Sequence, residues 1–414
     1  MPVAPAGGAP RVTDADLDAF RLARGFTTAS TACGLKASGR PDLLWVVADA
    51  PCAAAGVFTT NRVAAAPVLL DREHLSRAKG RIRAVIANSG CANSVTGERG
   101  MDDARRTATL GAQVLGVAAE QVLVLSTGVI GVFLDMDRIV RGIATLASSA
   151  ADHGAGDSAR AITTTDTVPK IASADVSLGG GTIRVAGFAK GAGMIHPDMA
   201  TMLAVITTDA RVEPGRLDRA LRAATARSFN RISVDGDMST NDTVLVLASG
   251  AAGVTVDDTT QAAFEQALTG VCAALARQIA RDGEGATRLV ELRVTGAADE
   301  PQAHQVGDAI ACSPLVKTAI HGNDPNWGRI LAAAGYSGAA IEPSRVRLWF
   351  GPDDEVQLLD RGLPVAFDRV RASELLCRDP AVIRLDLGLG GADATVWTCD
   401  LSAEYVRVNA EYTT

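Results

Sequence analysis

The chain has 414 residues, of which 47% are hydrophobic and 21% charged, and this length and composition predict a folded protein of about two domains. Its formal net charge of -7 and its dispersed basic residues argue against a nucleic-acid partner, and no apolar run is long enough to span a bilayer. The seven cysteines form no CxxC pair, which is typical of reduced thiols. We therefore expect a cytoplasmic protein with neither a nucleic-acid nor a membrane partner.

Short apolar runs alternate with helical patterns over the first two hundred residues. The runs at 43–49, 82–90 and 121–128 predict buried strands that end in Ser, Thr, Asn or Gly. Between and after them, apolar periodicity predicts helices over 104–116 and 136–147. This alternation indicates an α/β fold.

A hairpin opens the next part of the chain. Glycines at 179–181 predict its turn within 171–189, and a strand over 201–210 and a helix over 216–232 follow. Apolar residues along 264–279 mark the core face of a long helix. The strand pattern restarts at residue 289, so we place the main α/β domain over 1–288, a smaller α/β domain over 289–400 and a tail over 401–414.

Several familiar catalytic and metal-binding patterns are absent from the sequence. There is no GxSxG, GxxxxGK[ST], GxGxxG after a strand, or HExxH, and the five histidines lack ligand spacing, so we expect no metal. Asp235, Asp237 and Asp242 lie close together in sequence and leave two interpretations open. A metal cluster is conceivable, but turn and capping roles are more common for such residues.

The stretch KGAGMIHPDMATMLAV, residues 190–205, sets glycines, a proline and the small Ala200 before Thr201. A threonine hydroxyl can attack the preceding carbonyl in an N-to-O acyl shift, and hydrolysis of the ester then frees the threonine α-amine as a neighbouring base. A small preceding residue and a bent backbone favour this chemistry. From these residues alone, an ordinary loop before a strand is the commoner explanation.

Segments along nearly the whole chain resemble those of a known family, and this resemblance favours self-cleavage over an ordinary loop. AKGAGMIHPDMATML resembles the cleavage segment of the ornithine acetyltransferase (glutamate N-acetyltransferase, ArgJ) family. Other segments resemble family signatures in family order: NSGCAN (88–93), STGVIG (126–131), TTDTVPK (164–170), STNDT (239–243), DGEGATR (282–288), SPLVKTAIHGNDPNWGR (313–329) and YVRVNAEYTT (405–414). The resemblance implies an N-terminal-nucleophile-like layered sandwich, with stacked sheets flanked by helices and a smaller C-terminal α/β domain.

The resemblance also implies roles for particular residues. The chain is expected to cut itself between Ala200 and Thr201, giving an α chain of 1–200 and a β chain of 201–414. Thr201 is then the nucleophile, and the Thr127 hydroxyl and the Gly128 N–H stabilise the oxyanion. Substrate positions carried over from the family are Thr164, Lys190, Thr201, Glu284, Asn409 and Thr414, the last two on a tail that returns to the active site.

The activity implied is acetyl transfer from N-acetylornithine to glutamate in the cyclic arginine pathway, through a ping-pong acetyl-enzyme. No cofactor is expected, and the use of acetyl-CoA as a second acetyl donor stays open. The expected assembly is an α2β2 heterotetramer of self-cleaved chains. Two alternatives remain: a self-cleaving amidohydrolase or aminopeptidase, in which water accepts the acyl group, and an uncleaved amino-acid-binding protein.

Overall fold

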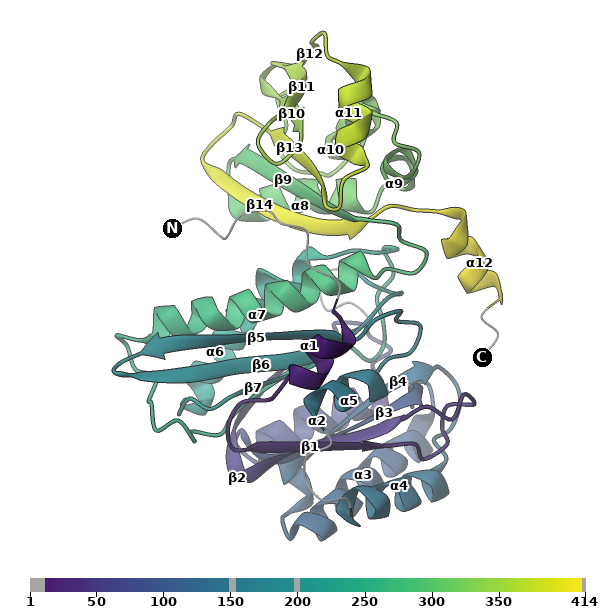
Figure 1. The fold of residues 1–414 in the computed structure, drawn as a ribbon, viewed down its shortest axis with the longest axis vertical. Helices are drawn as coiled ribbons and strands as arrows, with labels where there is room; N and C mark the ends of the chain where they lie inside the picture. Colours follow the sequence, from purple (N-terminus) through teal and green to yellow (C-terminus); the bar gives the residue numbers. More distant parts are fainter. Residues whose placement is uncertain (1–11, 149–153, 197–201, 412–414) are drawn as a thin grey trace.

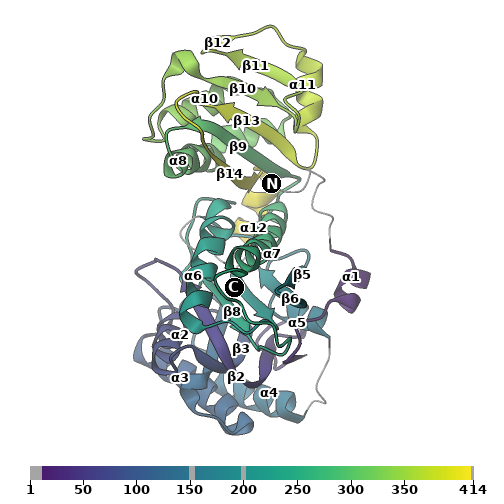
Figure 2. The ribbon, with the colours of Figure 1, turned by 90° about the vertical axis from the view of Figure 1, so that its left-hand side faces the viewer.

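The computed structural model describes residues 12–148, 154–196 and 202–411, and it contains two β-sheets, each with its own helices (Figure 1). The larger sheet has eight strands, and the smaller has six. Figure 2 shows the smaller sheet at one end of the molecule, above the larger one. No helix among the described residues combines the length and apolarity that crossing a membrane requires.

Seven strands of the larger sheet have the order β4-β3-β2-β8-β7-β6-β5, and the eighth, β1, pairs with the first part of β2. Its strands are β1 (Phe26–Thr31), β2 (Leu43–Phe58), β3 (Arg81–Cys91), β4 (Val122–Val129), β5 (Lys170–Leu178), β6 (Gly181–Lys190), β7 (Leu203–Thr208) and β8 (Thr243–Ala248). β2 is much longer than the run at 43–49 predicts. Its register shifts between Val47 and Cys52, and the residues beyond the shift pair with β8.

β2 connects the two halves of this sheet, β1–β4 and β5–β8. The two halves stack face to face, and residues from both of them form one core between them. Strand residues alternate between layers: Leu203 and Val205 of β7 face the other half of the sheet, whereas Ala204 and Ile206 face helices. The result is four layers, helix, sheet, sheet and helix, which confirms the layered sandwich with stacked sheets. The predicted hairpin is also present, with Leu178 paired to Gly181 across the turn.

Helices cover both outer faces of the sandwich. α6 and α7 pack on β5–β8, and α3 and α4 pack on β2–β4. The helices of this part are α1 (Asp14–Ala19), α2 (Ala66–Arg77), α3 (Gly97–Leu115), α4 (Met136–Ser148), α5 (Ala155–Ala161), α6 (Pro214–Ala226) and α7 (Gln261–Arg281). The helix expected over 216–232 ends at Ala226, and a short 3-10 turn follows it.

The smaller sheet has the order β12-β11-β10-β13-β9-β14, and its core is separate from that of the sandwich. Its strands are β9 (Leu289–Ala297), β10 (Arg347–Phe350), β11 (Val356–Asp360), β12 (Leu363–Pro364), β13 (Ala381–Asp386) and β14 (Ala392–Cys399). Its helices are α8 (Glu300–Ala311), α9 (Pro314–His321), α10 (Trp327–Gly335) and α11 (Arg369–Leu376). After β14 the chain returns to the sandwich as α12 (Ala403–Glu411) (Figure 1).

Candidate active site

β4 ends in a backbone position that only glycine can occupy. Gly128 pairs with Gly90 where the register of β3 and β4 is irregular, and its φ is +134°. A Cβ at this position would lie 2.3 Å from the carbonyl carbon of Gly90. The Gly90 backbone therefore packs directly against Gly128 and leaves no room for a side chain at this position.

The Thr127 hydroxyl contacts the ammonium group of Lys190, at the end of β6. Lys190 Nζ donates to Thr127 Oγ1 over 3.1 Å, and the two residues are 3% and 4% exposed. Because the hydroxyl oxygen accepts from a cation, its own proton is free to be donated elsewhere. Burial lowers the pKa of Lys190, although neighbouring carboxylates oppose the effect.

A buried carboxylate, Asp166, holds this arrangement together. Its Oδ1 accepts from the backbone N–H of Gly191 over 2.7 Å, and its Oδ2 accepts from the N–H of Thr164 over 2.9 Å. It also forms an ion pair with Lys170, which in turn contacts Asp282 at 2.5 Å. Burial alone would raise the pKa of Asp166, but Lys170 and Lys190 hold it well below its usual range.

Asp166 and Lys170 were not among the predicted site residues. They lie in the TTDTVPK segment, and their separation of four residues, with opposite charges, is the signal that could have pointed to the pair. Through Asp166, the predicted position Thr164 is joined to the segment that follows Lys190.

Ala200 and Thr201 lie outside the described residues, but carboxylates hold the chain on both sides of them. Before this segment, Asp235 accepts from the N–H groups of Met194 and Ile195 over 2.6 and 2.9 Å. After it, Asp242 Oδ1 accepts from the Met202 N–H over 2.9 Å. Asp235 and Asp242 thus bind backbone groups, as the turn and capping interpretation expected.

The second carboxyl oxygen of Asp242 is available for a further hydrogen bond. It is fully buried, and its Oδ2 has no hydrogen-bond partner among the residues that the structure describes. Burial raises the pKa of this carboxyl well above its usual value, although the Met202 N–H and the charge of Lys190 oppose the shift. The carboxyl lies close to where β7 begins.

Asn241 joins three of the segments noted in the sequence. Its Nδ2 donates to the carbonyl of Ala92 over 2.7 Å and to that of Ser126 over 2.8 Å. The amide therefore links STNDT to NSGCAN and STGVIG, and it is buried. The prediction missed this role, because the partners lie 149 and 115 residues away in sequence.

Glu284 and Asn409 lie next to each other at the edge of the site. Asn409 Nδ2, on α12, donates to Glu284 Oε2 over 2.9 Å, and the Glu284 N–H donates to the Ala192 carbonyl over 2.8 Å. α12 is held nearby by Ser402 Oγ, which donates to the Gly285 carbonyl over 2.6 Å. The remaining predicted substrate position, Thr414, lies outside the described residues.

The described site residues therefore form one connected group. Lys190 contacts Thr127, Asp166 binds the N–H of Gly191 that follows Lys190, and the Glu284 N–H binds the nearby Ala192 carbonyl. The group contains a hydroxyl donor, a buried cation and several carboxylates around the point where β7 begins. Such a site can stabilise the oxyanion of an acyl-transfer intermediate and bind a substrate that carries an ammonium group.

Comparisons with known proteins agree on one family. The model described as "ArgJ family" matches residues 27–414. "Arginine biosynthesis bifunctional protein ArgJ" of Symbiobacterium thermophilum is 49% identical over 395 residues, 94% of this chain and 97% of the relative.

Two solved structures are also similar in sequence. The Bacillus halodurans protein of the same name is 46% identical, covers 50% of this chain and 97% of its own, and gives a TM-score of 0.48. "Ornithine Acetyltransferase complexed with Ornithine" from Mycobacterium tuberculosis is 41% identical, covers 42% of this chain and 92% of its own, and gives a TM-score of 0.38.

Proposed function

The chain belongs to the ArgJ family, and from this premise we propose that it transfers an acetyl group from N-acetylornithine to glutamate in arginine biosynthesis. The observation that carries the proposal is the buried contact between Thr127 and Lys190. This contact leaves the Thr127 hydroxyl proton available as one donor for an oxyanion, and we assign the Gly128 N–H as the second donor, beside the strand that follows Thr201.

In the proposed reaction, the chain first cleaves itself between Ala200 and Thr201, which frees the Thr201 α-amine. Thr201 Oγ then attacks the acetyl carbonyl carbon of N-acetylornithine while the α-amine takes the hydroxyl proton. The carbon–nitrogen bond breaks, that proton passes to the leaving nitrogen, and ornithine departs. The glutamate amine attacks the resulting ester, and N-acetylglutamate leaves as Thr201 recovers its proton.

The charges around the site suit an acetylated diamino acid. Lys190, which the resemblance gave as a substrate position, is buried against Thr127, so we assign it to the polarisation of that hydroxyl. Glu284 is partly exposed, and it can receive the free ammonium group of ornithine. We assign the neutral side chains of Asn409 and Thr164 to hydrogen bonds with the substrate, and we propose the same role for Thr414.

Product analysis tests the transferase against the hydrolase. N-acetylornithine and glutamate should yield N-acetylglutamate in a one-to-one ratio with ornithine, whereas a hydrolase would release acetate. A ping-pong route also requires that the enzyme exchange labelled ornithine into N-acetylornithine when glutamate is absent. The relative's name includes "bifunctional", so acetyl-CoA with glutamate is the second donor pair to assay.

Thr127→Val should lower kcat by about 10²–10³-fold, because the isosteric methyl group cannot donate to the oxyanion. KM should change much less, since the hydroxyl contributes mainly in the transition state. Steady-state kinetics on the cleaved fraction measure this. Thr127→Ser, which keeps the hydroxyl, is the matched control, and equal kcat values for Val and Ser would remove Thr127 from the oxyanion site.

Asn409→Ala should raise KM for N-acetylornithine several-fold and leave kcat nearly unchanged, because Glu284 loses the donor that orients its carboxylate. Arg407→Ala provides the control, since Arg407 lies on the same helix and pairs only with Glu404 and Glu411 among the described residues. If the KM values of the two variants match that of the wild type, α12 plays no part in substrate binding.

The proposed assembly is an α2β2 heterotetramer of cleaved chains. Native mass spectrometry should then give the mass of two complete chains, with four polypeptides released on denaturation. A mass equal to one chain would contradict this assembly.

A further inference from the structure

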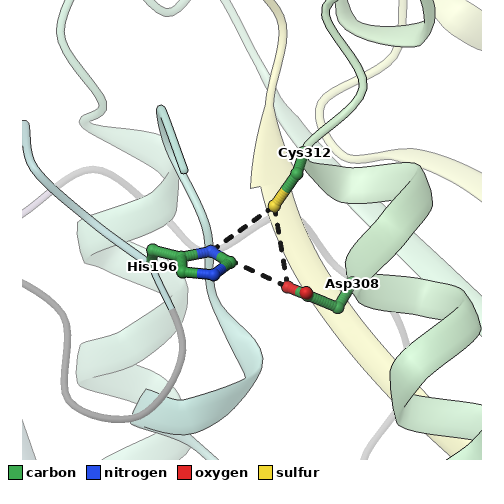
Figure 3. Close-up of side chains that lie close together, drawn as sticks. All are labelled: His196, Asp308 and Cys312. Carbon is green, nitrogen blue, oxygen red and sulfur yellow. Dashed lines mark hydrogen bonds and ion pairs between the residues drawn. The ribbon is translucent and has the colours of Figure 1, made fainter. Parts of the chain in front are cut away.

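Three potential metal ligands meet between the sandwich and the smaller domain, and none of them is among the residues assigned to acyl transfer. His196 follows β6 and lies in the sandwich, whereas Asp308 and Cys312 lie in and directly after α8 (Figure 3). His196 Nδ1 is 3.4 Å from Cys312 Sγ and 3.9 Å from Asp308 Oδ1, and Cys312 Sγ is 3.7 Å from Asp308 Oδ1. The three side chains point toward a common centre.

These separations are close to those that a tetrahedral zinc ion imposes on its ligands. At the usual Zn–S, Zn–N and Zn–O bond lengths, two tetrahedral ligands lie about 3.3–3.6 Å apart. Shifts of a few tenths of an ångström would bring all three atoms into range. Asp308 and Cys312 are also four residues apart at the end of one helix, a spacing that places both side chains on the same face.

The ligand types narrow the choice of metal. A thiolate selects zinc and other soft metals, imidazole suits zinc, and a carboxylate completes a mixed set that magnesium or calcium would not favour. The side chains of His196 and Asp308 are each 28% exposed, so an ion can enter from solvent. Three protein ligands leave a fourth position, and Ser233 Oγ lies 3.4 Å from Cys312 Sγ.

A cysteine nucleophile activated by histidine is the other chemistry that these residue types could support. In a triad the carboxylate contacts the ring nitrogen opposite the one that faces the nucleophile. Here Asp308 and Cys312 both face Nδ1.

We propose that His196, Asp308 and Cys312 bind one zinc ion, with water in the fourth position. The ion would link α8 of the smaller domain to the segment that immediately precedes residues 197–201. There it would fix the chain on the N-terminal side of the cleavage segment, as Asp235 fixes Met194 and Ile195 nearby.

The test is a cobalt titration of the untagged full-length protein after dialysis against a chelator. One equivalent of Co²⁺ should produce the visible bands of a tetrahedral site together with a thiolate-to-cobalt charge-transfer band, and one equivalent of Zn²⁺ should abolish both. Cys312→Ser should remove the charge-transfer band. His196→Ala and Asp308→Asn should each weaken zinc binding by about tenfold or more.

Cys377→Ser is the matched control, because Cys377 is an exposed free thiol after α11 and should not affect the titration. Thermal unfolding of each metal-free variant shows that it is folded, and added zinc should raise the midpoint of the wild type but not that of Cys312→Ser. Persistence of the charge-transfer band in Cys312→Ser, its loss in Cys377→Ser, or the absence of saturation at one equivalent would each overturn the proposal.

Discussion

Thr201→Ala should leave the chain uncut and without acetyltransferase activity. Alanine has no hydroxyl to attack the carbonyl of Ala200, so the N-to-O shift cannot begin. It also has no group to carry the acetyl ester, so the second function is lost with the first. A denaturing gel and an intact-mass spectrum should show one full-length chain, where the wild type gives fragments that begin at Met1 and Thr201.

Thr201→Ser separates the hydroxyl from the rest of the side chain. Serine keeps the nucleophile, so cleavage and acetyl transfer should both persist at reduced rates. When the reaction with N-acetylornithine is stopped rapidly, mass spectrometry of the enzyme should place the acetyl group on the peptide that begins at residue 201. Transfer activity in uncut Thr201→Ala, or an acetyl group trapped on another side chain, would refute the assigned nucleophile.

Local patterns in the sequence predicted much of the fold, because the relevant interactions are short-range. The apolar runs of β3, β4 and β7 and the glycine turn between β5 and β6 form the elements expected of them. Local patterns did not predict the full length of β2. Its second half, rich in alanine, has no strong strand propensity, and pairing with β8 makes it a strand.

In the site, too, some residues could be predicted from the sequence and others could not. Resemblance to the family pointed to Thr127, Gly128 and Lys190. The structure joins Lys190 to Thr127 by a hydrogen bond and packs the backbone of the neighbouring strand against Gly128, where a side chain would not fit. The supporting residues could not be found by local reasoning. Asn241 has partners more than one hundred residues away, and His196 meets Cys312 across 116 positions, so only the folded chain brings these groups together.

Asp166→Ala should lower the free energy of unfolding by about 3–5 kcal/mol, the usual cost of removing one partner from a buried ion pair. The Asp166 side chain is fully buried, and its loss leaves the ammonium groups of Lys170 and Lys190 to repel each other. Two backbone donors, at Thr164 and Gly191, lose their acceptor as well. Urea unfolding in the uncut Thr201→Ala background measures the change on a single chain.

Two further variants separate charge from hydrogen bonding. Asp258→Ala removes an exposed carboxylate that pairs with Arg216, so it should change stability little. Lys170→Met combined with Asp166→Ala removes the repelling cation, and the double variant should be more stable than Asp166→Ala alone even though Asp282 then loses its lysine partner. If the double variant is no more stable, the uncompensated charge is not what destabilises the chain. The loss of the acceptor for the backbone N–H groups of Thr164 and Gly191 would then explain why Asp166 is required.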